Sequence, residues 1–206
     1  MIKKLTGFFA FLLSVTISFS QTNPGAQLLP FNLNSQTGGT LPAGVAVHRF
    51  GTTAGAIPTT RTLIPGNGDL PYVLTVGSGG WKDEAANGLS ILASGAQSAG
   101  ALIIAINTTG STNIAVQWTT RLILQNPSWD NNIALQYRIG TTGNFIDIGT
   151  TSTFNTAGQV VGYSQTYLET LPAAAENQAV VQVRFIYWAT AGGSGSRDRI
   201  ALDDIS

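Results

Sequence analysis

Residues 113–125 read NIAVQWTTRLILQ, and this stretch decides the fold class. Apolar and polar side chains alternate along it, with a period of two residues. The apolar positions are Ile114, Val116, Trp118, Leu122 and Leu124, and the polar positions between them are Gln117, Thr119 and Arg121. Only a β-strand places alternate residues on opposite faces, so the stretch predicts a strand with one face in a core and the other in water.

The same alternation recurs in residues 132–140, NIALQYRIG, and in residues 179–189, AVVQVRFIYWA. Shorter strands are expected near residues 28–33, 45–50, 72–76, 88–93, 101–107, 145–148, 163–171 and 199–205, separated by turn clusters such as NTTGSTN. No stretch favours a helix. About eleven strands with one apolar face each predict an all-β fold, a two-sheet antiparallel β-sandwich of jelly-roll type. An up-and-down barrel is the alternative topology.

The first twenty residues, MIKKLTGFFAFLLSVTISFS, have the three parts of an export signal. Lys3 and Lys4 precede an apolar stretch, and Ser18 and Ser20 are small residues before the expected cleavage site. Cleavage is favoured over an uncleaved anchor, because the apolar stretch is short for a bilayer. We therefore expect a secreted or cell-surface protein whose residues 21–206 form one sandwich domain, with an irregular part at 21–70.

The composition of the mature chain limits its partners. Without the signal it has eight Lys and Arg against ten Asp and Glu, and it contains no cysteine. A net charge of −2 gives no basic footprint for nucleic acid. The domain would also be held by its core or by a bound ion, because it has no disulfides.

The closing residues 199–206, RIALDDIS, contain the only Asp-Asp pair of the chain. Ile200 and Leu202 share one face of the expected strand, whereas Ile205 has the opposite parity. If all three face the core, a bulge must shift the register at Asp203–Asp204. Without a bulge, one aspartate would point inward and need a cation, an arginine or backbone amides.

This closing strand, together with the Gly-rich turn before it, resembles the end of MAM-like modules and of carbohydrate-binding jelly rolls. Residues 75–206 are similar more broadly to a β-sandwich of large exported bacterial surface proteins, as in WKDEAANGLSILASG, NTTGSTNIAVQWTT and RIALDDIS. The resemblance implies an accessory module within a longer multidomain chain. We expect it to transfer no catalytic function, because residues 1–206 contain none of the catalytic or sorting domains that such modules precede.

Three strands offer a candidate ligand-binding face. Their polar residues and a bordering tryptophan are Gln117, Arg121, Gln136, Arg138, Gln182, Arg184 and Trp188. Planar amide and guanidinium groups can bond sugar hydroxyls, and an indole ring can stack on a pyranose. An ordinary solvated sheet face explains the same pattern and is favoured over a glycan site. Trp81 and Trp129 are expected in loops, capping the core.

The aspartate pair is a second candidate site. In the jelly rolls that the chain resembles, an acid in the last strand helps to hold a structural Ca²⁺, and the matching residues here are Asp203 and Asp204. Charge pairing with Arg197 or Arg199, or capping of strand-end amides, is an equally good interpretation, because no Asp-rich calcium loop is present.

The hypothesis of a catalytic function has little support in the sequence. His48 is the only histidine, and there is no cysteine, no Gly-x-Ser-x-Gly motif and no phosphate-binding loop. A glycosidase needs two facing carboxylates, and the spacing of the acids pairs none of them. The sequence therefore predicts a non-catalytic binding or adhesion module for glycans or a cell-surface partner. A structural spacer is the alternative, and a polysaccharide hydrolase is the third.

Overall fold

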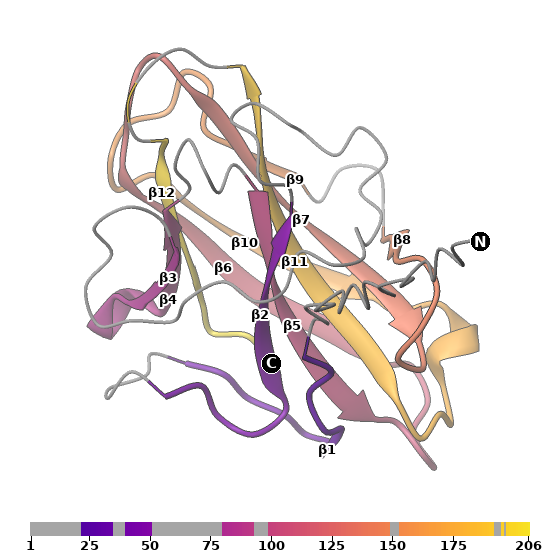
Figure 1. The fold of residues 1–206 in the computed structure, drawn as a ribbon. Helices are drawn as coiled ribbons and strands as arrows, with labels where there is room; N and C mark the ends of the chain where they lie inside the picture. Colours follow the sequence, from indigo (N-terminus) through magenta and orange to yellow (C-terminus); the bar gives the residue numbers. More distant parts are fainter. Residues whose placement is uncertain are drawn as a thin grey trace, which may run out of the picture.

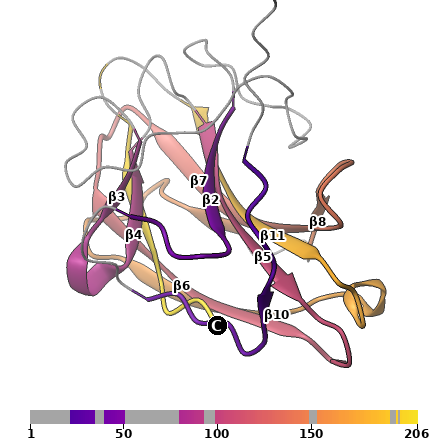
Figure 2. The same ribbon diagram turned by 60° about the horizontal axis from the view of Figure 1, so that its bottom comes forward.

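The computed structural model describes residues 22–34, 40–50, 80–92, 99–148, 153–191, 195 and 197–206. These residues form two β-sheets packed face to face, as Figures 1 and 2 show from two directions. The seven-stranded sheet has the order β1-β5-β11-β7-β8, with β2 also paired to β5 and β9 to β7. Its strands are β1 (Gln27–Leu28), β2 (Val45–Phe50), β5 (Ala99–Asn107), β7 (Asp130–Ile139), β8 (Ile146–Asp147), β9 (Thr153–Asn155) and β11 (Val181–Ala191).

The five-stranded sheet has the order β10-β6-β12-β4-β3. Its strands are β3 (Gly80–Asp83), β4 (Leu89–Leu92), β6 (Ala115–Leu124), β10 (Ser164–Thr170) and β12 (Arg199–Asp203). Every strand pair is antiparallel except β1 with β5, which is parallel. The predicted antiparallel β-sandwich is thus confirmed. The barrel alternative is wrong, because neighbouring strands lie far apart in the sequence and form two separate sheets.

The predicted strands match the structure closely where residues are described, except for the strand expected near residues 28–33, where only the two-residue β1 forms. Two short strands, β3 and β9, are not predicted, because four and three residues are too few to show an alternation. The only helical elements among the described residues are two single 3₁₀ turns, η1 (Ala85–Asn87) and η2 (Ala173–Ala175). None of the described helical segments could cross a membrane. The export signal and the strand expected at 72–76 lie outside the described residues.

The core fills the space between the sheets. Trp118 of β6 stacks on Tyr167 of β10 at 4.9 Å and meets Phe185 of β11 edge-on at 5.4 Å. Phe185 therefore carries the contact from one sheet to the other. Trp81 is fully buried in this core, but it lies on strand β3 and the prediction that it lies in a loop is wrong.

The closing strand contains the expected bulge. β12 ends at Asp203, which lies opposite Thr119 of β6, and Ser206 then exchanges two backbone hydrogen bonds with Gln117. From Asp203 to Ser206 the closing segment advances three residues, whereas the paired strand β6 advances only two, from Thr119 to Gln117. Asp204 absorbs the extra residue in a left-handed conformation with φ 49°. Ile205 consequently turns into the core and pairs with Leu33 through two backbone hydrogen bonds.

Candidate functional site

The structure separates the residues of the predicted ligand-binding face. Gln136 and Arg138 on β7 neighbour Gln182 and Arg184 on β11, because these strands pair in register. Gln117 and Arg121 lie on β6, which belongs to the other sheet. The seven predicted residues therefore do not form a single surface.

The expected exposure to solvent is wrong for five of the seven residues. Those five are nearly or fully buried: Gln136, Arg138, Gln182, Arg184 and Trp188. The outer face of the seven-stranded sheet even has a hydrophobic cluster of its own, formed by Ala101, Ile103, Ala134, Ile186 and Trp188. In β7 and β11 the alternation separates two buried faces. One face packs in the core between the sheets, and the other packs against side chains on the outer side of its sheet. A role of these residues in ligand binding stays a prediction.

The two buried arginines bond to neighbouring amides and share one aromatic ring. Arg138 donates from Nε and Nη2 to Oε1 of Gln182, at 2.8 and 2.6 Å, and Arg184 donates from Nε to Oε1 of Gln136 at 2.6 Å. The Arg138 and Arg184 guanidiniums lie 4.4 and 4.0 Å from the centroid of the Phe145 ring. Asn23 accepts further bonds from Arg138 and Gln182 through Oδ1. These side chains thus bond to one another within the protein.

Burial has a clear electrostatic consequence for this cluster. Desolvation, with a smaller effect of the nearby Arg138 charge, lowers the pKa of Arg184 to about 9, while Asp147 acts in the opposite direction. Desolvation also lowers the pKa of Arg138. With a pKa of about 9, the Arg184 guanidinium is still charged at neutral pH. Both guanidiniums are held by hydrogen bonds and by the π face of Phe145.

Gln117 and Arg121 do face the outside of the five-stranded sheet. The Gln117 side chain is exposed and Arg121 is half-buried, beside Thr119 and Thr166, whose hydroxyls are 3.0 Å apart. No aromatic side chain of the described residues alternates onto this face in β6 or β10, since Trp118 and Tyr167 point into the core. A sugar would find hydrogen-bonding groups here and no stacking platform.

The aspartate pair lies at the rim of the same sheet. Burial raises the pKa of Asp203, against the effect of hydrogen bonding and of Arg121. Arg199 forms its ion pair with Glu84 at 3.2 Å. The described residues contain no group of three or more His, Cys, Asp or Glu that could hold a metal ion. Calcium binding by Asp203 and Asp204 therefore stays a prediction.

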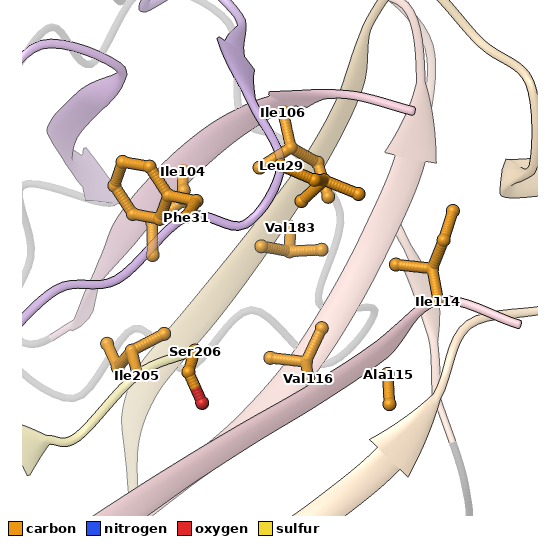
Figure 3. A pocket seen from close by; sticks show the side chains of 10 residues that line it. All are labelled: Leu29, Phe31, Ile104, Ile106, Ile114, Ala115, Val116, Val183, Ile205 and Ser206. Carbon is orange, nitrogen blue, oxygen red and sulfur yellow. The ribbon is translucent and has the colours of Figure 1, made fainter. Parts of the chain in front are cut away.

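A groove opens where the two sheets part at one end of the sandwich. Figure 3 shows its walls: Ile104 and Ile106 of β5 with Val183 of β11 on one side, Val116 and Ala115 of β6 with Ile114 on the other. Leu29 and Phe31 close it from the N-terminal segment, and Ile205 and Ser206 from the C-terminal one. Both ends of the described chain thus build this space.

The mouth of the groove is wider and more polar than its interior. Here the cavity volume is about 400 Å³, and the lining adds the uncharged residues Pro30, Asn32, Ser111, Thr112 and Asn113. The described residues that line the groove include no Asp, Glu, His, Lys or Arg. An apolar interior with a few polar groups at the mouth is the usual composition of a ligand site.

The loop from β5 to β6 forms the polar side of the mouth, and hydrogen bonds to η2 and its flanks hold this loop in place. Thr108 Oγ1 donates to the carbonyl of Ala175 at 2.7 Å, and Asn177 Oδ1 accepts from the Gly110 amide at 3.0 Å. The Asn113 amide donates to Glu176 Oε1 at 2.8 Å. Because η2 and its flanks fix this loop, the rim is preorganised and little ordering entropy is lost on binding.

Sequence reasoning did not predict this groove. Its interior residues read as ordinary strand core, and Leu29 and Phe31 read as part of a short N-terminal strand. The Asn and Thr residues of the rim lie in NTTGSTN, which reads as a turn. In the sequence, the only signal is that the polar residues Asn32 and Asn113 stand beside apolar neighbours, and asparagine is common in turns.

No protein-family model matches the sequence, and no curated protein matches it. Solved structures with similar folds include a protein described by the promiscuous specificity of carbohydrate-binding modules of the β-sandwich superfamily (12% identity, TM-score 0.45, covering 86% of this chain and 62% of that one). The K3 adhesin domain of Lys-gingipain from Porphyromonas gingivalis is also similar (15% identity, TM-score 0.44, 85% and 97% coverage).

Xylanase 10C from Cellvibrio japonicus is similar as well, with 11% identity and a TM-score of 0.43. The match covers 85% of this chain and 28% of the xylanase. The chain is thus similar to β-sandwich carbohydrate-binding modules and adhesin domains. At these identities the likeness concerns the fold alone.

Proposed function

We propose that the chain is an exported, non-catalytic binding module that recognises a glycan through the groove at the end of the sandwich. The observation that supports the proposal is the composition of the groove, an apolar interior behind a rigid rim of uncharged amides and hydroxyls. A pyranose presents the complementary pattern, with C–H faces and a ring of hydroxyls.

The chemistry of the groove favours binding over catalysis. Hydrolysis of a glycosidic bond uses two carboxylates on either side of the scissile bond. The described lining residues supply none, and Glu176, which contacts the rim residue Asn113, accepts a hydrogen bond from its backbone amide. A ligand held here would meet amide and hydroxyl groups, which orient it and transfer no proton at neutral pH.

The proposal is tested by binding of the mature chain to a panel of soluble and insoluble polysaccharides, followed by variants of the rim. The double variant Asn32→Ala and Thr112→Ala removes two rim side chains, one from the N-terminal segment and one from the loop between β5 and β6. We expect the affinity to fall about 5- to 150-fold, because each of the two hydrogen bonds to a neutral group contributes about 0.5–1.5 kcal/mol. The matched control is Asn144→Ala with Thr142→Ala, which changes the same residue types in the exposed turn between β7 and β8.

A third variant separates the groove from the polar sheet face. Gln117→Ala with Arg121→Ala removes the outward side chains of β6 that the sequence predicts for ligand binding. Loss of retention in this variant, with full retention in the rim variant, would move the site to the sheet. If the wild-type chain is retained by no polysaccharide in the panel, the spacer alternative replaces the binding proposal.

A further inference from the structure

The groove has two compartments of very different size. The open mouth has a volume of about 400 Å³, and an inner recess behind it has a volume of about 30 Å³. The two are continuous, because Leu29, Phe31, Ile114, Ala115 and Ser206 line both. A ligand in the mouth can therefore extend one small group into the recess.

The walls of the recess decide what that group can be. Apart from Ser206, its lining consists of aliphatic side chains and the Phe31 ring, with Ile104, Ile106 and Val183 facing Ile114 and Val116. A volume of about 30 Å³ exceeds the roughly 10–15 Å³ that one water molecule occupies by the same measure. A buried water, however, makes about three hydrogen bonds. An aliphatic wall does not provide them, so an apolar group of methyl size is the better occupant.

Resting on the proposed glycan function, we propose that the ligand is a neutral sugar with a methyl-bearing substituent, and that this methyl group occupies the recess. An acetamido group and a 6-deoxy position both present such a methyl group. The ring hydroxyls then face Asn32, Thr112 and Asn113 at the mouth. The absence of charged side chains from the described lining disfavours uronic acids and free amino sugars, because neither charge would be paired.

Matched sugar pairs test the methyl group directly. The wild-type chain is titrated by calorimetry or NMR with N-acetylglucosamine against glucose, and with L-fucose against L-galactose, which differ only at the substituent. We expect the methyl-bearing member of at least one pair to bind about fourfold more tightly, the ratio that one buried methylene supplies. The pair that shows this preference identifies the acetamido or the 6-deoxy source. Glucosamine should bind more weakly than N-acetylglucosamine.

A filled recess tests the location. Val116→Ile adds one methylene from β6, and Val183→Ile adds one from β11, so each occupies the recess from a different sheet. Either variant should abolish the preference within the pair, because the added methylene takes the place of the ligand's methyl group. The control is Val161→Ile, which makes the same change at a residue that is 57% exposed. Two variants are used because overpacking can lower stability at one position, and melting curves show which of them is folded.

The outcomes separate this inference from the proposed function. Equal affinities within both pairs would overturn the methyl recess while the glycan function stands. A preference that survives in folded Val116→Ile and Val183→Ile would place the methyl group elsewhere. If the chain binds no sugar of either pair and no polysaccharide in the panel, the glycan function itself fails.

Discussion

Phe145 explains how two arginines can lie buried on neighbouring strands. Arg138 and Arg184 both place their guanidiniums against this one ring, which is 5% exposed. The negative π face offsets part of the desolvation of both cations, while Gln136 and Gln182 accept their hydrogen bonds. The ring also covers the part of the outer sheet face that carries these two arginines.

Replacing Phe145 with alanine should therefore destabilise the domain strongly. We expect a loss of about 3–5 kcal/mol in the free energy of unfolding, because the change leaves a cavity and removes the shared contact of two buried cations. Urea unfolding measures the loss. Ile146→Ala is the control, since the neighbouring Ile146 side chain is 56% exposed and should cost little. Equal stabilities of the two variants would contradict the role given to the ring.

Tyr167 makes stability depend on pH in the alkaline range. Burial, with a smaller effect of Tyr163, raises its pKa from 10.0 to about 12. Between these values the folded state keeps the phenol proton that the unfolded state loses. The folded state binds more protons there, so stability falls as the pH rises from about 10 to about 12.

Tyr167→Phe should make this alkaline loss shallower. Melting temperatures of wild type and variant are compared from pH 7 to pH 12. At pH 7 the two should be similar, because the Tyr167 hydroxyl has no hydrogen-bond partner in the structure and the aromatic contact with Trp118 is retained. The same alkaline slope in both proteins would show that another group titrates there.

At the scale of elements, alternation in the sequence located the long strands well. β6, β7 and β11 agree with their predicted ranges to within two residues. The bulge at Asp203–Asp204 was also foreseeable, because Ile205 breaks the parity of Ile200 and Leu202. Such patterns are readable because the pleat fixes the side of each residue whatever its neighbours are.

The calcium prediction belongs to the closing strand. If Asp203 and Asp204 hold Ca²⁺ together with backbone carbonyls, chelation with EGTA should lower the melting temperature of the wild type. Asp203→Asn should melt lower than the wild type and should not respond to EGTA. An equal melting temperature of the wild type with and without the chelator would reject calcium. It would leave Asp204 with the conformational role that its positive φ shows.

At the scale of the whole molecule, the groove depends on segments that meet only after folding. Leu29 and Phe31 come from the start of the described chain, and Ile205 and Ser206 from its end. The backbone bonds of Leu33 to Ile205 and of Ser206 to Gln117 bring these segments together at one edge of the sandwich. The groove wall that these two segments form therefore depends on the backbone hydrogen bonds that hold them in place.

The sequence by itself determined the all-β class, the long strands and their inward faces, because each follows from a local period of two. The tertiary structure alone decided that β7 and β11 share one sheet while β6 lies in the other. It also decided that Arg138 and Arg184 are buried under Phe145 and that the sheets part at one end to leave a groove. Pairing between distant strands and the covering of a face are set by long-range packing, and alternation along one strand carries no record of either.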